Sequence, residues 1–127
     1  MKIQESAENY LETILVLSQK GQSVRSIDIV NELGYSKPSV SIAMKKLREN
    51  GYIFMDVDGH ITLSPSGSEI AERIFERHTV LSRVLIDLGV PEETALEDAC
   101  RIEHVISSET FDIIKKHIEK HSEKQAL

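Results

Sequence analysis

The stretch CRIEHVIS, residues 100–107, contains the only cysteine of this 127-residue chain, with a glutamate and a histidine close behind it. On a helix, with 100° per residue, Cys100, Glu103 and His104 fall on one face within a single turn. A cysteine that serves packing belongs with apolar residues, whereas this one falls among polar ones. A thiolate, a carboxylate and an imidazole at this spacing can converge on one small ion. The spacing therefore makes these residues candidate ligands of a transition metal. The alternative is that the glutamate and the histidine are only solvated and that the cysteine is merely tolerated there.

A histidine further upstream supports this interpretation. His78 follows Ile74 by four residues and precedes Leu81 by three, so helical periodicity predicts that its side chain faces inward. Taken alone, such a residue is most simply explained as a buried histidine with a hydrogen-bond partner. Beside a Cys/Glu/His triplet on the next helix, a role as a metal ligand explains it better. Glu12, on the first predicted helix, could supply a second carboxylate.

Apolar residues at helical spacing predict three helices in the first half of the chain, over residues 3–20, 26–33 and 36–50. Ser26 and Ser36 are the expected N-caps of the second and third helices. The second helix is expected to bury Ile27, Ile29, Val30 and Leu33, and the third Val40, Met44 and Leu47. A short turn containing a glycine separates these two helices, which is the pattern of a helix-turn-helix.

A hairpin is predicted directly after the third helix, in the segment YIFMDVDGHITLS. Its two short apolar runs flank Asp58–Gly59, a dipeptide typical of tight hairpin turns. A helix-turn-helix followed by a β-hairpin is the order of elements in a winged helix. The same order would also fit a small α+β domain without a DNA partner, because fold alone does not determine function.

Helical periodicity returns in the second half of the chain. A long helix is expected to end at Gly89, the next to begin after Pro91, and the last to begin near Ser108. The long helix is expected to bury Ile70, Ala71, Ile74, Phe75, Leu81, Leu85 and Leu88. We therefore predict a mainly α fold with a small β-hairpin. It comprises a winged helix-turn-helix DNA-binding domain in residues 1–63 and an all-helical domain in residues 64–127.

Composition places the chain among cytoplasmic folded proteins. The sequence is 40% hydrophobic and 28% charged, which is ordinary for a globular domain. A single cysteine forms no disulfide within the chain, as expected in a reducing compartment. No apolar run approaches the length of a membrane span, and the N-terminal residues become acidic where a signal peptide would become apolar. We therefore expect a cytoplasmic protein without a membrane partner.

The net charge of −6 conceals a basic patch in residues 36–50, where four cationic side chains accompany the single carboxylate of Glu49, a net of +3. Contact with phosphate is short-ranged in salt, so an acidic protein with such a patch can bind DNA. The predicted DNA-contacting residues are Ser36, Lys37, Pro38, Ser39, Ile42, Lys45 and Lys46. The lysines suit phosphate contacts, and the hydroxyl and apolar groups suit phosphate oxygens and thymine methyls. Alternatively, the lysines only keep the helix soluble. Asp56 and Asp58 flank the wing tip, which is expected to bind phosphate little.

These motifs together resemble the diphtheria-toxin-repressor family of metal-dependent transcriptional repressors, especially its short, manganese-transport-regulator-like branch without an SH3-like domain. The resemblance is carried by ENYLETI, SKPSVSIAMKKLRENGYI, LSPSG, RHTVL and EDACRIEHVIS. It implies a homodimer that binds a palindromic DNA operator when loaded with a divalent transition metal, and that controls metal-uptake genes. It also implies that residues 64–127 bind metal and dimerise, with Phe111 and Ile114 near the dimer surface. The ligands that it implies are Asn9, Glu12, His78, Cys100, Glu103 and His104.

Two of these positions bear on the choice of metal. The manganese-sensing branch has Asp at the position of Asn9 and Glu at that of Cys100, whereas the iron-sensing branch has Met and Cys there. A thiolate favours Fe²⁺, Zn²⁺ or Co²⁺ over Mn²⁺, which prefers oxygen ligands. We therefore expect Fe²⁺, with Mn²⁺ second, and Zn²⁺ or Co²⁺ as substitutes in vitro. Ser82 and Leu96 stand where longer members carry additional ligands, which disfavours a second site of that kind.

Two other classes of function fit parts of the pattern. A metal-independent winged-helix regulator would bind DNA but would leave Cys100, Glu103 and His104 without a role. A small metalloenzyme could use an open coordination position to activate water. However, a chain of this length leaves little volume for a substrate cleft beside a winged helix, and it offers no obvious separate base. We therefore expect a regulator rather than an enzyme.

Overall fold

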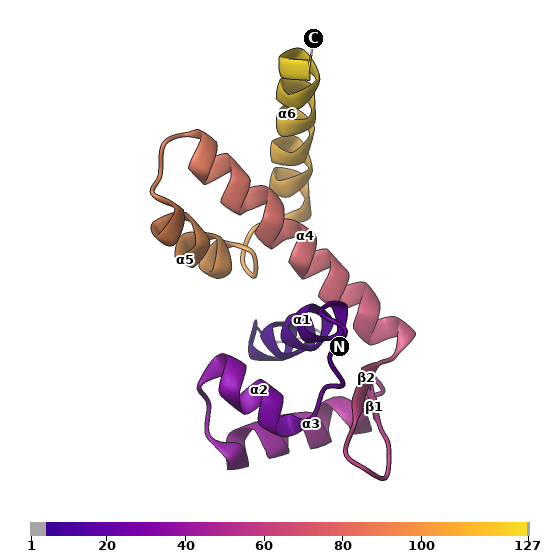
Figure 1. Cartoon of the computed structure of the whole chain (residues 1–127). Coiled ribbons are helices and arrows are strands. Elements are labelled where there is room, and N and C mark those ends of the chain that lie inside the picture. The colour runs from indigo at the N-terminus through magenta and orange to yellow at the C-terminus, as the bar shows by residue number, and fades with distance from the viewer. Residues whose placement is uncertain (1–4, 127) are drawn as a thin grey trace. The chain divides into compact units, whose positions relative to one another are not determined.

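The computed structural model describes residues 5–126 of the chain, with the side chains of residues 5–120. In chain order its elements are α1 (Glu5–Gln19), α2 (Ser26–Leu33), α3 (Lys37–Glu49), β1 (Ile53–Met55), β2 (Ile61–Leu63), α4 (Pro65–Asp87), α5 (Glu92–Ile102) and α6 (Ser108–Ala126) (Figure 1). These elements confirm the prediction of a mainly α fold with a small hairpin. The expected start of the first helix at Ile3 lies outside the described residues. The chain forms two compact units that divide between Arg73 and Ile74, within α4.

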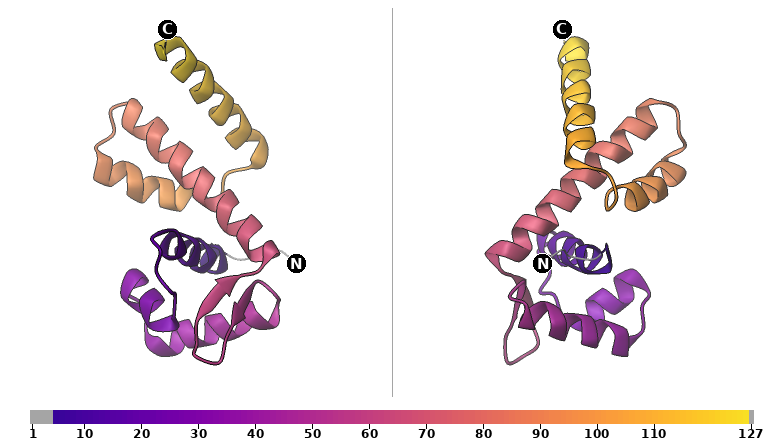
Figure 2. Two further views of the ribbon diagram at one scale, coloured as in Figure 1. Left: turned by 45° about the vertical axis from the view of Figure 1, so that its right-hand side comes forward. Right: turned by 180° about the vertical axis from the view of Figure 1, so that it is seen from behind.

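The first unit is a helix-turn-helix to which the hairpin is attached. α2 packs against α3, α1 contacts both α2 and β2, and α3 contacts β1. The buried apolar side chains of these elements and of the segment before α2 are Tyr10, Leu11, Ile14, Leu15, Leu17, Val24, Ile29, Val40, Met44, Leu47, Ile53 and Ile61. The predicted inward residues of α3 are all among them. The turn between α2 and α3 lies at one end of α3 and the hairpin at the other, as Figure 2 shows from two sides.

The short helix α2 differs from its prediction at its N-cap and at three of the four residues expected to be buried: Ile27 is exposed, and Val30 and Leu33 are only half-buried. Its N-cap is Arg25 rather than Ser26, and the carboxylate of Asp28 accepts the backbone N–H of Arg25 at 2.8 Å. Ile27, which was expected to be buried, is 44% exposed, whereas Ile29 is fully buried. Residues two apart on a helix point in clearly different directions, so a single neighbouring helix cannot cover both.

The turn between α2 and α3 is fixed by caps on both sides. α2 ends at Gly34 as predicted, with φ of +71° and an N–H that donates to the carbonyl of Val30 at 2.9 Å. Ser36 is the N-cap of α3 as predicted, since its Oγ accepts the N–H of Ser39 at 3.2 Å. Pro38 occupies the first turn, where a helix needs no N–H donor. The N-terminal end of α3 is therefore held in place by local hydrogen bonds.

The wing is an antiparallel hairpin whose turn contains the predicted Asp58–Gly59, with a φ of +83° at Gly59. The register pairs Ile53 with Leu63, Phe54 with Thr62, and Met55 with Ile61. The carboxylate of Asp56 accepts the N–H groups of Asp58 and His60, both at 2.9 Å. The hydrogen bond from the His60 N–H, with smaller contributions from the His60 ring and the Asp58 N–H, lowers the pKa of Asp56. Negative charge is therefore built into the wing tip.

A serine-glycine junction, Ser64 to Gly67, joins the wing to α4. Ser64 Oγ donates to the carbonyl of Gly51 at 2.7 Å and accepts the N–H of Gly67 at 3.1 Å. The N–H of Ser64 donates to the carbonyl of Tyr52 at 3.0 Å. A methyl group on Gly67 would overlap that same carbonyl oxygen of Tyr52, so no larger side chain fits without a shift of backbone. The LSPSG motif thus serves close packing between α4 and the start of β1.

The second unit contains the C-terminal part of α4 together with α5 and α6. Its buried apolar residues are Ile74, Leu81, Ala95, Ala99 and Phe111. Leu88, predicted on the buried stripe of the long helix, is exposed instead, because α4 ends at Asp87 and the periodicity no longer applies beyond it. Over the described residues, no helix combines the length and the apolar character that crossing a membrane requires.

Candidate functional site

The turn that follows α5 carries two of the predicted metal ligands. α5 ends at Ile102, and Glu103 keeps helical dihedral angles while its N–H donates to the carbonyl of Ala99 at 2.9 Å. His78 reaches this turn from α4, and its Nδ1 lies 2.8 Å from Oε2 of Glu103. Nε2 of His104 lies 3.4 Å from the other carboxylate oxygen, Oε1. The structure thus brings His78, Glu103 and His104 together within the second unit.

The carboxylate of Glu103 sits in an unusual electrostatic environment. Its side chain has no exposed surface, and the side chain of His104 is 1% exposed. Burial of a carboxylate is costly unless hydrogen bonds or a positive charge compensate it. The Nδ1–H of His78 donates to Oε2, but Oε1 accepts no hydrogen bond from any residue that the structure describes. A buried carboxylate with such an oxygen and two imidazoles beside it fits a divalent transition-metal ion, which would bring the positive charge.

The helical face predicted for residues 100–107 is only partly correct. At 100° per residue, Ala99 and Val105 are both expected on the apolar face opposite Cys100. Ala99 is fully buried as this predicts, but Val105 is 75% exposed. The reason is that the regular helix ends at Ile102, so a step of 100° per residue does not describe the turn that follows. Glu103 is polar by type yet fully buried, because His78 from another helix provides its partner.

The other predicted ligands belong to α5 and α1. Cys100 is on the last turn of α5, four residues before His104, and it is exposed. Asn9 and Glu12 lie three residues apart on α1 in the first unit, and both are half-buried. Residues three apart on a helix are neighbours on its surface, so these two side chains could bind one ion together.

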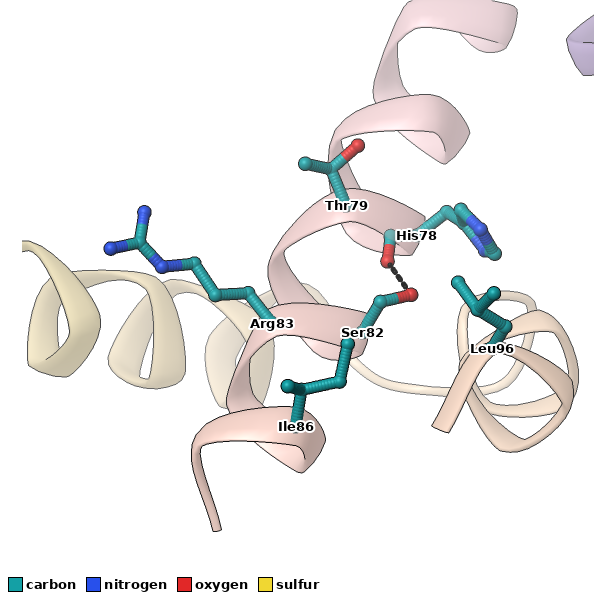
Figure 3. A pocket seen from close by; sticks show the side chains of 6 residues that line it. All are labelled: His78, Thr79, Ser82, Arg83, Ile86 and Leu96. Carbon is teal, nitrogen blue, oxygen red and sulfur yellow. Dashed lines mark hydrogen bonds between the residues drawn. The ribbon is translucent and has the colours of Figure 1, made fainter. Parts of the chain in front are cut away.

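A hollow of about 350 Å³ adjoins His78 on the surface of the second unit (Figure 3). Its lining residues are His78, Thr79, Ser82, Arg83, Ile86 and Leu96. The Oγ of Ser82 donates a hydrogen bond to the carbonyl of His78 at 2.7 Å, drawn as a dashed line in Figure 3. The side chain of Leu96 has no atom that could bind a metal. These are the two positions at which longer family members are expected to carry additional ligands. Among the residues that line the hollow, this leaves His78 as the one side chain suited to bind a transition metal.

The predicted DNA-contacting residues share one property in the structure: every one of them is exposed. Ile42 is notable because it is a large apolar residue with 58% of its surface exposed on an otherwise polar helix face. The Oγ of Ser36 donates to Oγ of Ser39 at 2.8 Å while it caps the helix, so both hydroxyls are held at the N-terminal end of α3. Such a surface matches what a recognition helix presents to the major groove.

Arg77 also reaches the turn after α5, although the sequence prediction leaves it out. It is buried, and it donates hydrogen bonds to two carbonyls of the segment that follows α5. Its position three residues after Ile74 and four before Leu81 puts it on the inward stripe of α4. An arginine on an apolar stripe, next to a candidate ligand, is the signal by which the sequence could have revealed it.

Comparison with known proteins gives a consistent assignment over nearly all of the chain. The model of the iron dependent repressor N-terminal DNA binding domain matches residues 2–61, and that of the iron dependent repressor metal binding and dimerisation domain matches residues 64–125. An uncharacterised HTH-type transcriptional regulator from Methanocaldococcus jannaschii is 32% identical over 94% of this chain and 98% of its own. The transcriptional regulator MntR of Escherichia coli O157:H7 is 33% identical over 94% of this chain and 77% of its own.

A solved structure of a manganese-dependent transcriptional repressor in complex with manganese is similar as well, with a TM-score of 0.81 and 26% identity. The match covers 89% of this chain and 52% of that one, so the chain spans about half the length of the solved structure. A winged helix joined to a helical unit with a histidine-carboxylate cluster is the architecture of a metal-responsive DNA-binding regulator. The chain belongs to the iron-dependent repressor family, as the resemblance of its sequence motifs predicted.

Proposed function

We propose that this chain is a metal-dependent transcriptional repressor that binds a palindromic operator as a homodimer and controls metal-uptake genes. In this proposal, residues 1–63 bind DNA, and residues 64–127 bind the metal and form the dimer. The observation that carries it is the buried carboxylate of Glu103 between His78 and His104, within the segment matched by a metal-binding family model. Its relative in Escherichia coli is a transcriptional regulator, which supports a regulatory role over an enzymatic one.

The proposed ligands are divided between the two units. His78, Glu103 and His104 form the cluster described above, and Cys100 adds a thiolate from the last turn of α5. Glu12 and Asn9 are the proposed ligands from α1, on the strength of the family resemblance. When bound, a divalent cation would supply the positive charge that compensates Glu103. Nδ1 of His78, which donates to Glu103 here, must give up that hydrogen bond if the same nitrogen binds the ion.

Ligands from both units would make the ion a link between DNA-binding and helical domains. If the ion binds only the conformation in which both sets of side chains reach it, metal binding shifts the population toward that conformation. The size of the shift depends on how much more tightly the ion binds that conformation than the others. In a two-fold dimer, the arrangement sets the separation of two α3 helices, which must match half-sites one DNA turn or a multiple apart. Repression would therefore require the metal.

The choice of metal depends on Cys100. Thiolate and imidazole ligands favour Fe²⁺ over Mn²⁺, which prefers carboxylate and carbonyl oxygens. We therefore place Fe²⁺ first and Mn²⁺ second, with Zn²⁺ and Co²⁺ as ions that the same side chains would accept in vitro. A relative solved with manganese keeps Mn²⁺ in the proposal.

The test is an anaerobic titration of the metal-free protein with Fe²⁺, Mn²⁺, Zn²⁺ and Co²⁺, while binding to a DNA duplex from the upstream region of its own gene is followed. Cys100→Ser is the informative variant, and His117→Gln, an exposed histidine of α6, is the matched control. We expect operator affinity to rise at lower concentrations of Fe²⁺ than of Mn²⁺, and this order to be lost in Cys100→Ser alone. Equal DNA binding with and without every metal would favour a metal-independent winged-helix regulator.

A further inference from the structure

Arg77 is a buried arginine whose side chain ends at the turn that carries two of the proposed ligands. It is 8% exposed. Its Nη1 donates to the carbonyl of Glu103 at 3.2 Å and to that of Ile106 at 2.9 Å. Its Nη2 donates to Oγ of Ser108 at 3.3 Å, and its guanidinium carbon lies 5.5 Å from the ring centroid of Phe111. One side chain thus contacts the segment from the end of α5 to the start of α6.

The chemistry of the guanidinium suits this position. The last carbonyls of a helix have no partner within the helix and carry partial negative charge. Nη1 donates to the carbonyl of Glu103, the C-cap of α5, and to that of Ile106 beyond the helix, while Nη2 donates to Ser108. A single ammonium group cannot direct three hydrogen bonds with the same planar geometry. A buried arginine without hydrogen bonds would be strongly disfavoured, so the contacts and the burial of Arg77 depend on each other.

Arg77 and His78 are consecutive residues of α4, and both hold Glu103. Arg77 binds its backbone carbonyl, and His78 binds its carboxylate. Because Arg77 contacts the backbone, it leaves the carboxylate oxygens to the imidazoles and to an incoming cation. No hydrogen bond joins Arg77 to a carboxylate in the described part of the chain, so its charge is not used as an ordinary ion-pair partner.

We propose that Arg77 is a positioning residue that fixes the turn of residues 103–106 on α4, so that Glu103 and His104 already face the metal site before an ion binds. This inference rests on the proposed function, because it assigns Arg77 a role toward the same site. Residues that orient metal ligands without touching the metal usually contribute about 10–100-fold to metal affinity. Arg77 acts through the backbone of Glu103 rather than through a ligand side chain.

The test compares metal affinity and local motion in Arg77→Met and in a matched control, Arg83→Met. Arg83 lies on the same helix but is exposed and pairs with Asp87 at 3.9 Å. We expect Co²⁺ and Fe²⁺ to bind Arg77→Met about 10–100-fold more weakly than wild type at temperatures well below unfolding. In the metal-free protein, amide hydrogens of residues 104–107 should exchange faster in Arg77→Met, and in Arg83→Met they should not.

The outcomes show whether the positioning role of Arg77 fails alone or together with the proposed metal site. If wild type binds metal and a folded Arg77→Met binds it within twofold as tightly, the positioning role is overturned and the metal site stands. If wild type itself binds no metal, the proposed function fails, and the positioning role fails with it. If Arg77→Met does not fold, Arg77→Lys replaces it, since the lysine keeps the charge but loses the fork. Weaker metal binding by a folded Arg77→Lys supports the role, and wild-type affinity overturns it.

Discussion

Among the ten largest of the fully buried side chains in the described residues, Glu103 is the only ionisable one. The side chains beside Glu103 explain how its carboxylate can be buried. His78 donates to one oxygen, and His104 lies beside the other. The same logic explains Arg77, whose buried guanidinium is matched to backbone carbonyls. Single residues in this chain are thus informative where their chemistry and their burial disagree.

Gly67→Ala is expected to destabilise the protein, because the added methyl would overlap the carbonyl oxygen of Tyr52. The clash involves backbone on both sides, so relief requires α4 to move away from the start of β1. Overpacking of this kind costs about 1–3 kcal/mol. The measurement is the free energy of unfolding from denaturant titration, with Ser68→Ala, one residue further along α4, as the control. Wild-type stability in Gly67→Ala would mean that this junction is not closely packed in solution.

At the scale of elements, α3 presents its predicted apolar residues to the core and its predicted DNA-contacting residues to solvent. Its N-terminal end is capped by Ser36 and follows a glycine-ended α2. The wing that follows carries Asp56, whose pKa is lowered by the hydrogen bond from the His60 N–H, so the wing tip keeps its negative charge. Phosphate binding by the first unit should therefore come mainly from α3.

Lys46→Ala is expected to reduce the salt dependence of operator binding. If Lys46 neutralises one phosphate, the slope of log K against log salt should become less negative by about 0.9. The loss should be similar for operator and for unrelated DNA, because phosphate contacts position without specifying sequence. Anisotropy titrations at several salt concentrations measure the slope, with Lys20→Ala, beyond the end of α1, as the control. An unchanged slope would assign Lys46 to solubility alone.

Helical periodicity and turn residues predicted an element well where residues close together in the sequence determine it. Val40, Met44 and Leu47 repeat at helical spacing, and Asp58–Gly59 specifies its own turn, so α3 and the hairpin follow from the sequence. Periodicity was wrong at Ile27, Leu88 and Val105, which lie on a one-sided helix or beyond a helix end. The contacts of Glu103 with His78 and Arg77 join residues 25 and 26 positions apart, and no local pattern specifies such distant partners.

At the scale of the whole molecule, the metal and the operator are proposed to bind the same conformation of the protein, so that their two binding equilibria are coupled. Whatever factor the metal contributes to operator affinity, the operator must contribute to metal affinity, because the coupling free energy is reciprocal. The factor expected for such coupling is about 5–150-fold. The two ligands would bind different segments of the chain, because residues 2–61 match a DNA binding domain and residues 64–125 a metal binding and dimerisation domain.

Reciprocity gives a quantitative prediction. The dissociation constant for Fe²⁺, measured by anaerobic equilibrium dialysis, should fall on addition of operator DNA by the same factor by which Fe²⁺ lowers the dissociation constant for the operator. A duplex of the same length with a scrambled sequence is the control and should produce a smaller change. Tight operator binding that leaves metal affinity untouched would show that the two sites are independent.

Operator binding by Glu103→Gln, with and without metal, tests most directly whether a metal ion at Glu103 controls DNA binding. Glutamine keeps the size of the side chain but removes the charge that a divalent cation compensates. Glu109→Gln, at an exposed position in the first turn of α6, is the matched control. We predict that metal raises operator affinity in wild type and in Glu109→Gln, and leaves a folded Glu103→Gln at its metal-free level. If metal raised the operator affinity of Glu103→Gln as much as that of wild type, Glu103 would not be a ligand of the activating metal.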